Sequence, residues 1–471
     1  MNISMCQRPD AISEVKELMT SNETFISSKD SSPMLTVKLD VMTGWYKLTY
    51  GFVPIPKHLF FDTVTRLDID KQIKKMEYIK YAFGYTSYYK ELRAKLQPTH
   101  PSLSEEELDT LTKETYLFSG YGLFSMLLPF DFEFEIDNKK SPDKKPVLIH
   151  LGLMLSGTLD KDALGSSSGS LLHHMSKDYG NAFASEFIMN LQCYVNDTLQ
   201  FLGFSCGMED FVPQDRNEID KVIEETLIKA MYHMENEKDP YVRELLISNT
   251  LNTPKNEGAH YAETSLDPSN NLVVQVKSGS KGKWTNIAEI TSVIGQTFVS
   301  SKRIPKLFGG RSLSCFPRSS LRSDAEDQLP RNHTVLDAIR IFQSRGFIRS
   351  SYFHGLQPFE YFLAAAGGRE GSIHTAVTTA DTGYIQRKIT KILEDLQVSY
   401  VGTVNTPSQN IVQFSYGGDN IDPARLMKVD IDTTKPNAKE KSSKTIYSFI
   451  DVAHVVNRLN TQKEFKSIES H

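Results

Sequence analysis

Apolar and polar residues follow two different periods along this chain, and the two periods predict which segments are helices and which are strands. Apolar positions three and four residues apart predict helices over 70–96, 177–203, 217–237, 239–251 and 334–343. Another helix is expected to begin at Ser102. Alternation with a period of two predicts strands over 34–50 (around a turn at Thr43–Gly44), 130–137 and 147–159, and a hairpin over 398–414. Polar loops are expected over 252–271, 319–332 and 435–444, and a last strand or helix over 445–459. This mixture predicts an α+β fold.

The stretch from Gly355 to Leu396 predicts one long helix. Pro358 suits a first helical position, where the missing N–H has no intrahelical partner to lose. Glu360 then lies in the first turn, where a negative charge favours the helix dipole. No further proline occurs before Pro407. A helix from Pro358 to Leu396 would be about 58 Å long at 1.5 Å per residue.

Small residues line one face of this predicted helix. Ala376, Thr379, Ala380 and Gly383 recur at helical spacing, and Tyr384 and Arg387 border them. Two interpretations stay open: close packing of another helix, or support for a flat, negatively charged ligand such as a base pair. Four interior glycines, Gly367, Gly368, Gly371 and Gly383, make the helix locally soft.

The opposite face of the same helix carries branched apolar residues. We expect it to face a hydrophobic core. Its residues are Ile385, Ile389, Ile392, Leu393 and Leu396.

Composition and charge limit the class of protein. The 471 residues are enough for two or three domains, and the net charge of −5 excludes a generally basic protein that coats nucleic acid. None of the four cysteines forms a C-x-x-C pair, which fits a reducing, intracellular compartment. No signal peptide is visible, and the apolar run over 116–132 is too short and broken to span a membrane.

One segment is markedly basic. Residues 277–322 contain nine Lys and Arg residues and one glutamate, Glu289. The segment is either a solvated basic surface or a contact for the phosphates of nucleic acid or nucleotides. The candidate contacts are Lys277, Lys281, Lys283, Lys302 and Arg303.

Catalytic and metal-binding patterns are weak. Acidic residues alternate over 130–137, which favours a solvated strand edge over a metal site. The Gly/Ser run at 165–170 lacks the G-K-[ST] ending of a P-loop, so it is expected to be a structural loop, and His173 and His174 are expected to be core or surface residues. No Ser/His/Asp set, H-E-x-x-H motif or aspartate cluster for Mg²⁺ is recognisable. The residues alone therefore describe a scaffold that contacts nucleic acid, with no catalytic residue and no metal ligand of its own.

A run of motifs in residues 346–419 resembles the bridge-helix region of the largest subunit of multisubunit DNA-directed RNA polymerases. The motifs are G-F-I at 346–348, G-L-Q-P at 355–358, G-G-R-E-G at 367–371, T-A-V at 375–377, T-G-Y-I-Q-R at 382–387 and L-E-D at 393–395. G-S-K-G at 279–282 and K-R-I at 302–304 resemble the segment between funnel and bridge helix in that subunit. Residues 164–173 and 203–207 resemble its pore, so the resemblance spans roughly residues 8–425.

The resemblance implies a role in DNA-templated RNA synthesis, as part of a multisubunit nucleotidyltransferase and not as an isolated chain. It implies that Thr379 and Ala380 lie beside the incoming template position, and that Gly383, Tyr384 and Arg387 flank the template strand. It implies a pore and funnel that admit nucleoside triphosphates. The implied partners are a second-largest subunit, companion pieces of the largest subunit, DNA and RNA, with no membrane and with an intracellular location in nucleus, cytoplasm or virion.

Two motifs of that family are absent. Neither the magnesium loop N-A-D-F-D-G-D nor the trigger-loop motif Q-S-I-G-E-P occurs, so Mg²⁺ would be bound by another chain. We therefore expect a middle piece of a split largest subunit, or a fragment of one, with inserts at 76–115 and 311–343. Its lineage would be divergent, and large DNA viruses are one candidate. The alternative is a non-catalytic, nucleic-acid-binding interaction protein derived from a polymerase fragment.

The resemblance also divides the chain into expected domains. Residues 1–145 form an active-site-to-pore region, 146–215 the pore region and 216–275 a funnel helical hairpin. Residues 276–345 form a basic funnel-to-bridge segment with an insert, 346–400 the bridge helix, and 401–471 a hairpin and tail.

Overall fold

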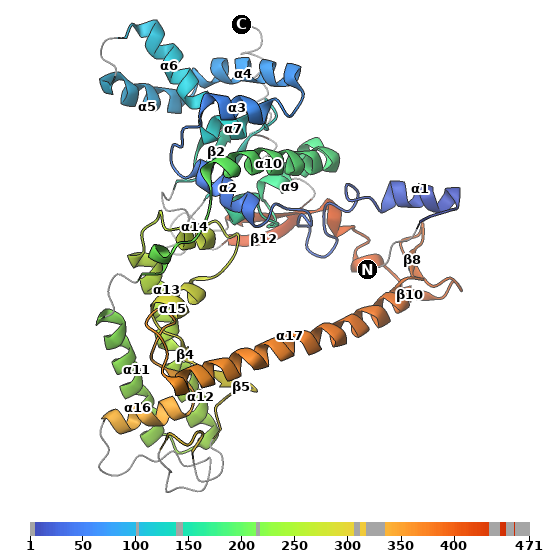
Figure 1. The fold of residues 1–471 in the computed structure, drawn as a ribbon. Coiled ribbons are helices and arrows are strands. Elements are labelled where there is room, and N and C mark those ends of the chain that lie inside the picture. Colours follow the sequence, from blue (N-terminus) through green and yellow to red (C-terminus); the bar gives the residue numbers. More distant parts are fainter. Residues whose placement is uncertain are drawn as a thin grey trace. The chain divides into compact units, whose positions relative to one another are not determined.

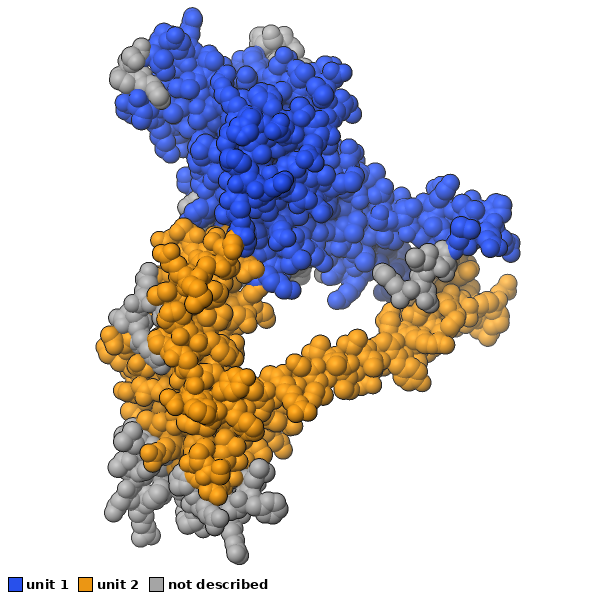
Figure 2. Space-filling view, in the orientation of Figure 1, with its two compact units in different colours: residues 1–204, 277–281, 415–471 blue, residues 205–276, 282–414 orange. Residues whose placement is uncertain are grey.

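The computed structural model describes residues 5–99, 103–137, 145–212, 217–305, 311–316, 335–432, 443–448 and 456. Within these residues the chain is a mixture of helices and short antiparallel strands, which confirms the predicted α+β class (Figure 1). The chain forms two compact units (Figure 2). The first contains residues 1–204, 277–281 and 415–471, and the second contains residues 205–276 and 282–414.

The first unit is mainly helical, with a three-stranded sheet in the order β1-β2-β3. Its strands are β1 (Phe134–Ile136), β2 (Val147–His150), β3 (Leu153–Ser156), β11 (Met427–Asp432) and β12 (Ser443–Ser448), the last two forming a separate pair. Its helices are α1 (Pro9–Leu18), α2 (Asp40–Thr49), α3 (Lys57–Val64), α4 (Ile69–Phe83), α5 (Ser87–Leu96), α6 (Glu105–Leu117), α7 (Gly120–Ser125), α8 (Lys161–Leu164), α9 (Leu171–Tyr179) and α10 (Asn181–Leu202). One continuous hydrophobic core joins helices α2 to α10 to the sheet, whereas α1 contributes no buried residue to it.

The strand expected over 34–50 is wrong, because this segment forms α2. Eight of its ten residues are buried, which leaves only Asp40 and Lys47 as a narrow polar edge of the helix. Gly44 lies inside the helix, where a Cβ atom would be 2.4 Å from Cγ1 of Val195 on α10. Beside it, Nε1 of Trp45 donates a hydrogen bond to the carbonyl oxygen of Leu191 at 3.2 Å. Gly44 thus permits close packing of two helices and does not form a turn.

Three helix predictions in this unit are confirmed with adjusted boundaries. The segment 70–96 divides into α4 and α5, where the Thr86 side chain caps α5 by accepting from the N–H of Tyr89. The segment 177–203 belongs to α9 and α10, which meet at Gly180 with φ of +89°. The helix expected from Ser102 is α6, which begins after Ser104, where the Ser104 hydroxyl and Glu107 form a capping box.

The strand pair expected over 147–159 is confirmed as β2 and β3. The strand expected over 130–137 is reduced to β1. Asp131 accepts a hydrogen bond from the Tyr179 hydroxyl at 2.6 Å, and Glu133 lies 2.6 Å from Nδ1 of His150. These two carboxylates therefore link parts of the unit, and the interpretation of a solvated strand edge is wrong for them.

The second unit contains the long helix α17 (Pro358–Leu393) and the helical hairpin expected over 217–251. Its other helices are α11 (Asn217–Asn236), α12 (Pro240–Leu251), α13 (Thr253–Ser265), α14 (Asn271–Lys277), α15 (Trp284–Thr291) and α16 (Val335–Ser344). Its strands are β4 (Gly295–Gln296), β5 (Phe298–Val299), β6 (Lys302–Arg303), β7 (Phe347–Ile348), β8 (Gln397–Val398), β9 (Val404–Asn405) and β10 (Ile411–Gln413). Helices α11 and α12 share a core with Val293, Phe342 and Phe347, and β9 and β10 confirm the expected hairpin.

The polar loop expected over 252–271 is wrong, because most of it forms α13. Pro254 lies in the first turn, and the buried face of the helix consists of small residues, Gly258, Ala259 and Ala262. A Cβ atom at Gly258 would lie 3.4–3.6 Å from side-chain atoms of Ala288 on α15 and of Ser292 and Val293, which follow that helix. Small residues carry little hydrophobic signal in the sequence, although they allow two helices to pack closely.

Some expectations lie outside the described residues. The polar insert at 319–332, most of the charged segment at 435–444 and nearly all of 449–459 are among them. In the part of the chain that the structure describes, no helix combines the length and the apolar character needed to cross a membrane.

Candidate nucleic-acid interface

Helix α17 is fixed at its first turn by a buried carboxylate. Glu360 is 2% exposed, and its Oε2 accepts a hydrogen bond from the N–H of Gln357 at 3.1 Å. Its Oε1 accepts from the N–H of Arg349 at 3.3 Å. Pro358 occupies the first turn, as the sequence predicts. The acidic residue expected only to favour the helix dipole therefore also ties the helix to the segment after β7.

A second anchor lies three turns along the helix. Both carboxylate oxygens of Glu370 accept from the N–H of Ser300, at 2.6 and 2.7 Å. Ser300 and Ser301 form the β5–β6 turn with φ of +52° and +59°, values that L residues rarely adopt. Gly367 brings the helix close to this hairpin, since a Cβ atom there would be 3.4 Å from the carbonyl oxygen of Phe298. The amino-terminal third of α17 is thus held by β5, β6 and the segment after β7.

The rest of α17 is exposed. From Gly371 to Leu393 every residue is exposed except Thr378, which is half-buried. The expectation that Ile385, Ile389 and Ile392 face a core is wrong, because these side chains are 53%, 46% and 70% exposed. The helix extends away from the body of its own unit after its anchored part (Figure 1). No helix or strand in the described part of this unit therefore covers the apolar face of α17.

The stripe of small residues is also open. Ala376, Thr379, Ala380 and Gly383 are all exposed, so helix packing within the described part of this chain does not explain them. A Cβ atom added at Gly383 would meet no atom within 4 Å. The Thr379 hydroxyl donates to the carbonyl oxygen of Thr375 at 2.7 Å, which satisfies its polar group internally. The result is a flat face that another molecule can approach closely.

Aromatic and cationic side chains border the stripe. Nζ of Lys388 lies 3.9 Å from the centre of the Tyr384 ring. Arg387 is exposed and makes no ion pair within the described residues. Lys391 pairs with Glu394 at 2.8 Å, and this hydrogen bond raises the pKa of Lys391. The free guanidinium next to a flat face has the chemistry needed for a phosphate contact.

The five candidate residues of the basic segment have different environments. Lys281, Lys283 and Lys302 are exposed, whereas Lys277 is half-buried. Arg303 has a fully buried side chain, and its Nε and Nη2 donate to the Glu244 carboxylate at 2.7 and 2.6 Å. Arg303 therefore does not belong to an exposed basic surface, and its place in the predicted patch is corrected. Its partner Glu244 lies 59 residues earlier in the chain, and nothing in the local sequence indicates the pair.

The described residues contain no group of three His, Cys, Asp or Glu side chains suited to hold a metal ion. His173 is buried, and its Nδ1 accepts from the N–H of Gly169 at 3.1 Å. Burial, with a smaller contribution from Lys177, lowers the pKa of His173 to about 4. Within the ranges that the structure describes, no set of side chains therefore fits a Mg²⁺ site.

Comparison with known proteins identifies the family. Models of RNA polymerase Rpb1 domains 3, 4 and 5 match residues 24–211, 223–326 and 355–461 in that order. A probable DNA-directed RNA polymerase II subunit RPB1 homolog of Invertebrate iridescent virus 6 is 29% identical over 98% of this chain and 42% of its own length. Subunit RPC1 of DNA-directed RNA polymerase III from Saccharomyces cerevisiae is 28% identical, over 90% of this chain and 28% of its own length. DNA-directed RNA polymerase subunit Rpo1N of Sulfolobus acidocaldarius is also 28% identical, over 90% of this chain and 45% of its own length.

These matches confirm the resemblance seen in the sequence. The chain belongs to the family of the largest subunits of multisubunit RNA polymerases, and it corresponds to the middle portion of such a subunit. It spans less than half the length of each of these three relatives.

Proposed function

We propose that this chain is a subunit of a DNA-directed RNA polymerase and that α17 is its bridge helix, supporting the template strand during RNA synthesis. The observation that carries the proposal is the exposed half of α17, which presents a flat stripe bordered by Tyr384 and Arg387. The anchors at Glu360 and Glu370 hold one end of the helix, so the free half has a defined direction.

The stripe suits a base pair for steric and electrostatic reasons. Thr379, Ala380 and Gly383 present small groups, so a planar base can lie against the helix without meeting a long side chain. Tyr384 offers an aromatic ring for stacking, and Arg387 offers charge to a template phosphate. This chain would accelerate the reaction by positioning the template base rather than by proton transfer.

The other proposed roles follow from the same family. The α11–α12 hairpin and the region of residues 146–215 would form the funnel and pore through which nucleoside triphosphates enter. Lys281, Lys283 and Lys302 would contact nucleic-acid phosphates. Mg²⁺ bound by another chain would supply the Lewis-acid chemistry of nucleotidyl transfer. The second-largest subunit and companion pieces of the largest subunit would be the protein partners, in an intracellular compartment.

Co-purification tests the assembly. A tagged version of the full chain is expected to isolate a second-largest subunit and a chain that carries the magnesium loop, in fixed ratio and with RNA synthesis activity. A chain that binds nucleic acid and never isolates these two partners would instead be a non-catalytic interaction protein derived from a polymerase fragment.

The substitution Gly383→Leu tests the stripe. Because a Cβ atom at Gly383 would meet no atom of the described residues within 4 Å, folding should be unaffected. Loss of base stacking of about 1–3 kcal/mol predicts elongation slower by roughly 5- to 150-fold. Gly371→Leu is the matched control, since Gly371 is equally open and lies about 120° around the helix from Gly383, away from the stripe. If Gly383→Leu reduces assembly as much as elongation, the stripe packs against a protein partner and not against the template.

A further inference from the structure

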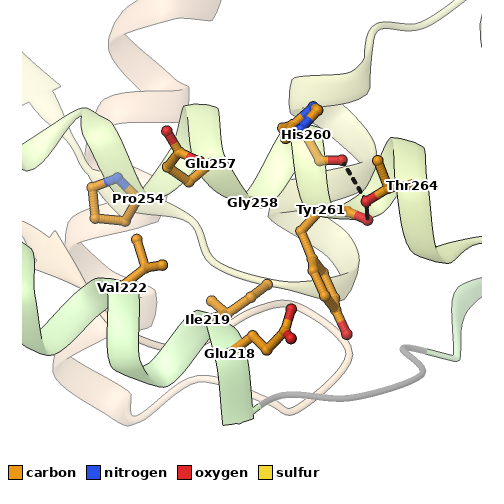
Figure 3. Close-up of a pocket in the computed structure, with 9 residues that line it drawn as sticks. All are labelled: Glu218, Ile219, Val222, Pro254, Glu257, Gly258, His260, Tyr261 and Thr264. Carbon is orange, nitrogen blue, oxygen red and sulfur yellow. Dashed lines mark hydrogen bonds between the residues drawn. The ribbon is translucent and has the colours of Figure 1, made fainter.

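A small pocket lies between α11 and α13 of the second unit (Figure 3). Its volume is about 220 Å³. Sites for drug-sized ligands are usually about 300–1,000 Å³, so this pocket fits one side chain better than a whole cofactor or substrate. None of its lining residues is assigned above to the template, and although α11 belongs to the proposed funnel, the proposed function gives this pocket no role.

The pocket has an apolar floor and one aromatic wall. Ile219 is 5% exposed and Pro254 is buried, and both line the pocket together with Val222. Figure 3 shows Ile219 and Val222 of α11 facing Pro254 and Tyr261 of α13. Gly258 of α13 also lines the pocket. A Cβ atom on it would point away, toward Ala288 of α15 and the residues just after that helix. An aliphatic chain of a few methylene groups can be buried on this floor.

Two carboxylates lie at the rim. Glu218 comes from α11 and Glu257 from α13, and both are exposed. Neither makes an ion pair or hydrogen bond within the described residues. No lysine or arginine is among the described residues that line the pocket. Figure 3 shows the Glu218 carboxylate beside the Tyr261 ring, so negative charge and an aromatic face lie next to each other.

We propose that this pocket binds an arginine side chain presented by another polypeptide. The methylene groups of arginine would cover Ile219 and Val222. The planar guanidinium would lie against the Tyr261 ring and donate hydrogen bonds to the carboxylates of Glu218 and Glu257. Lysine fits less well because its ammonium is a strongly hydrated point charge that cannot stack. A neutral side chain of the same shape leaves both carboxylates without a cation.

The first test uses the full chain with isotope-labelled isoleucine and valine methyl groups and the probe N-acetyl-arginine amide. The methyl signals of Ile219 and Val222 should shift and saturate, with a dissociation constant that is roughly millimolar for so small a probe. Added salt should weaken binding, because the carboxylates are exposed. N-acetyl-citrulline amide, which has nearly the same shape without the charge, should cause no saturable shift. Equal shifts with citrulline, or no saturation with arginine, would overturn the proposal.

The second test separates the pocket from the general negative charge of the surface. Glu218→Gln and Glu257→Gln should each raise the dissociation constant about two- to fivefold, the range of one exposed charge pair. Glu225→Gln on α11 and Glu263→Gln on α13 are matched controls, because both residues are exposed on the same helices and do not line the pocket. The controls should leave the dissociation constant unchanged. If they weaken binding as much as the pocket variants, the pocket is not the site, and the polymerase proposal is unaffected.

Discussion

Replacing Glu244 by glutamine removes the carboxylate that holds the buried Arg303. The Arg303 side chain is fully buried, whereas the Glu244 side chain is 39% exposed. Arg345 approaches the same carboxylate at 3.5 Å. The variant therefore removes a carboxylate that contacts one buried guanidinium and approaches a second one.

The expected cost follows from this burial. Breaking a buried ion pair by removing one partner costs about 3–5 kcal/mol. Solvent reaches Glu244, and glutamine keeps one oxygen acceptor, so the lower value of about 2–3 kcal/mol is expected here. That free energy corresponds to an opening constant for β5, β6 and β7 that is roughly 30- to 150-fold larger.

Hydrogen exchange of the full chain measures this opening. Amides in 295–304 and 345–348 should exchange faster in Glu244→Gln by the same factor, when opening is at equilibrium. Exchange in 367–371 should also increase, because Glu370 is bonded to the Ser300 N–H in the hairpin that contains Arg303. Glu225→Gln, an exposed substitution on α11, should change stability by less than about 0.5 kcal/mol and leave these amides unchanged.

A double variant decides whether the loss of this charge pair is the cause. Glu244→Leu with Arg303→Met removes both charges, and exchange should return toward the wild-type rate. Wild-type exchange in Glu244→Gln, or faster exchange in the double variant than in the single one, would refute the reasoning.

Further predictions concern two glycines, one in each unit, and the buried His173 of the first unit. Gly44→Ala should lower its free energy of unfolding by about 1–3 kcal/mol, because the new Cβ would be 2.4 Å from Val195. At Gly371 an added Cβ would meet no described atom within 4 Å, so Gly371→Ala should instead stabilise α17 by about 0.5–1 kcal/mol. Urea unfolding measures both changes in the free energy of unfolding. Changes of the same sign would contradict the packing argument. His173 has a pKa lowered to about 4, so the unfolded chain binds a proton between about pH 6.5 and pH 4 that the folded chain does not. The free energy of unfolding should therefore decrease as the pH is lowered, by about 2 kcal/mol from pH 7 to pH 5. His173→Gln should remove this part of the pH dependence.

Local signals in the sequence were sufficient for several elements. The proline at position 358 and the acidic residue at 360 predicted the start of α17 correctly, and its end differs by three residues, at Leu393 in place of Leu396. The helix expected from Ser102 and the two helices of the α11–α12 hairpin were also correct. These features depend on residues within one or two helical turns, so the chain reveals them without knowledge of distant contacts.

Elements whose character depends on distant neighbours were missed. Helix α2 is buried on nearly all sides by distant parts of its unit, and the buried face of α13 is made of small residues that carry little hydrophobic signal. The pocket between α11 and α13 was missed for a similar reason, since Glu218 and Glu257 are 39 positions apart and meet only through the packing of two helices.

By itself, the sequence determined the family, the α+β class, the long helix and the order of small and apolar residues along its faces, because motifs and periods are local properties. Only the tertiary structure decided which of these faces are covered. It buried Arg303 against Glu244, anchored α17 through Glu360 and Glu370, and left the isoleucine face and the small-residue stripe open. The physical reason is that burial and charge pairing depend on which distant segments come together, and the pattern along one helix contains no information about its neighbours.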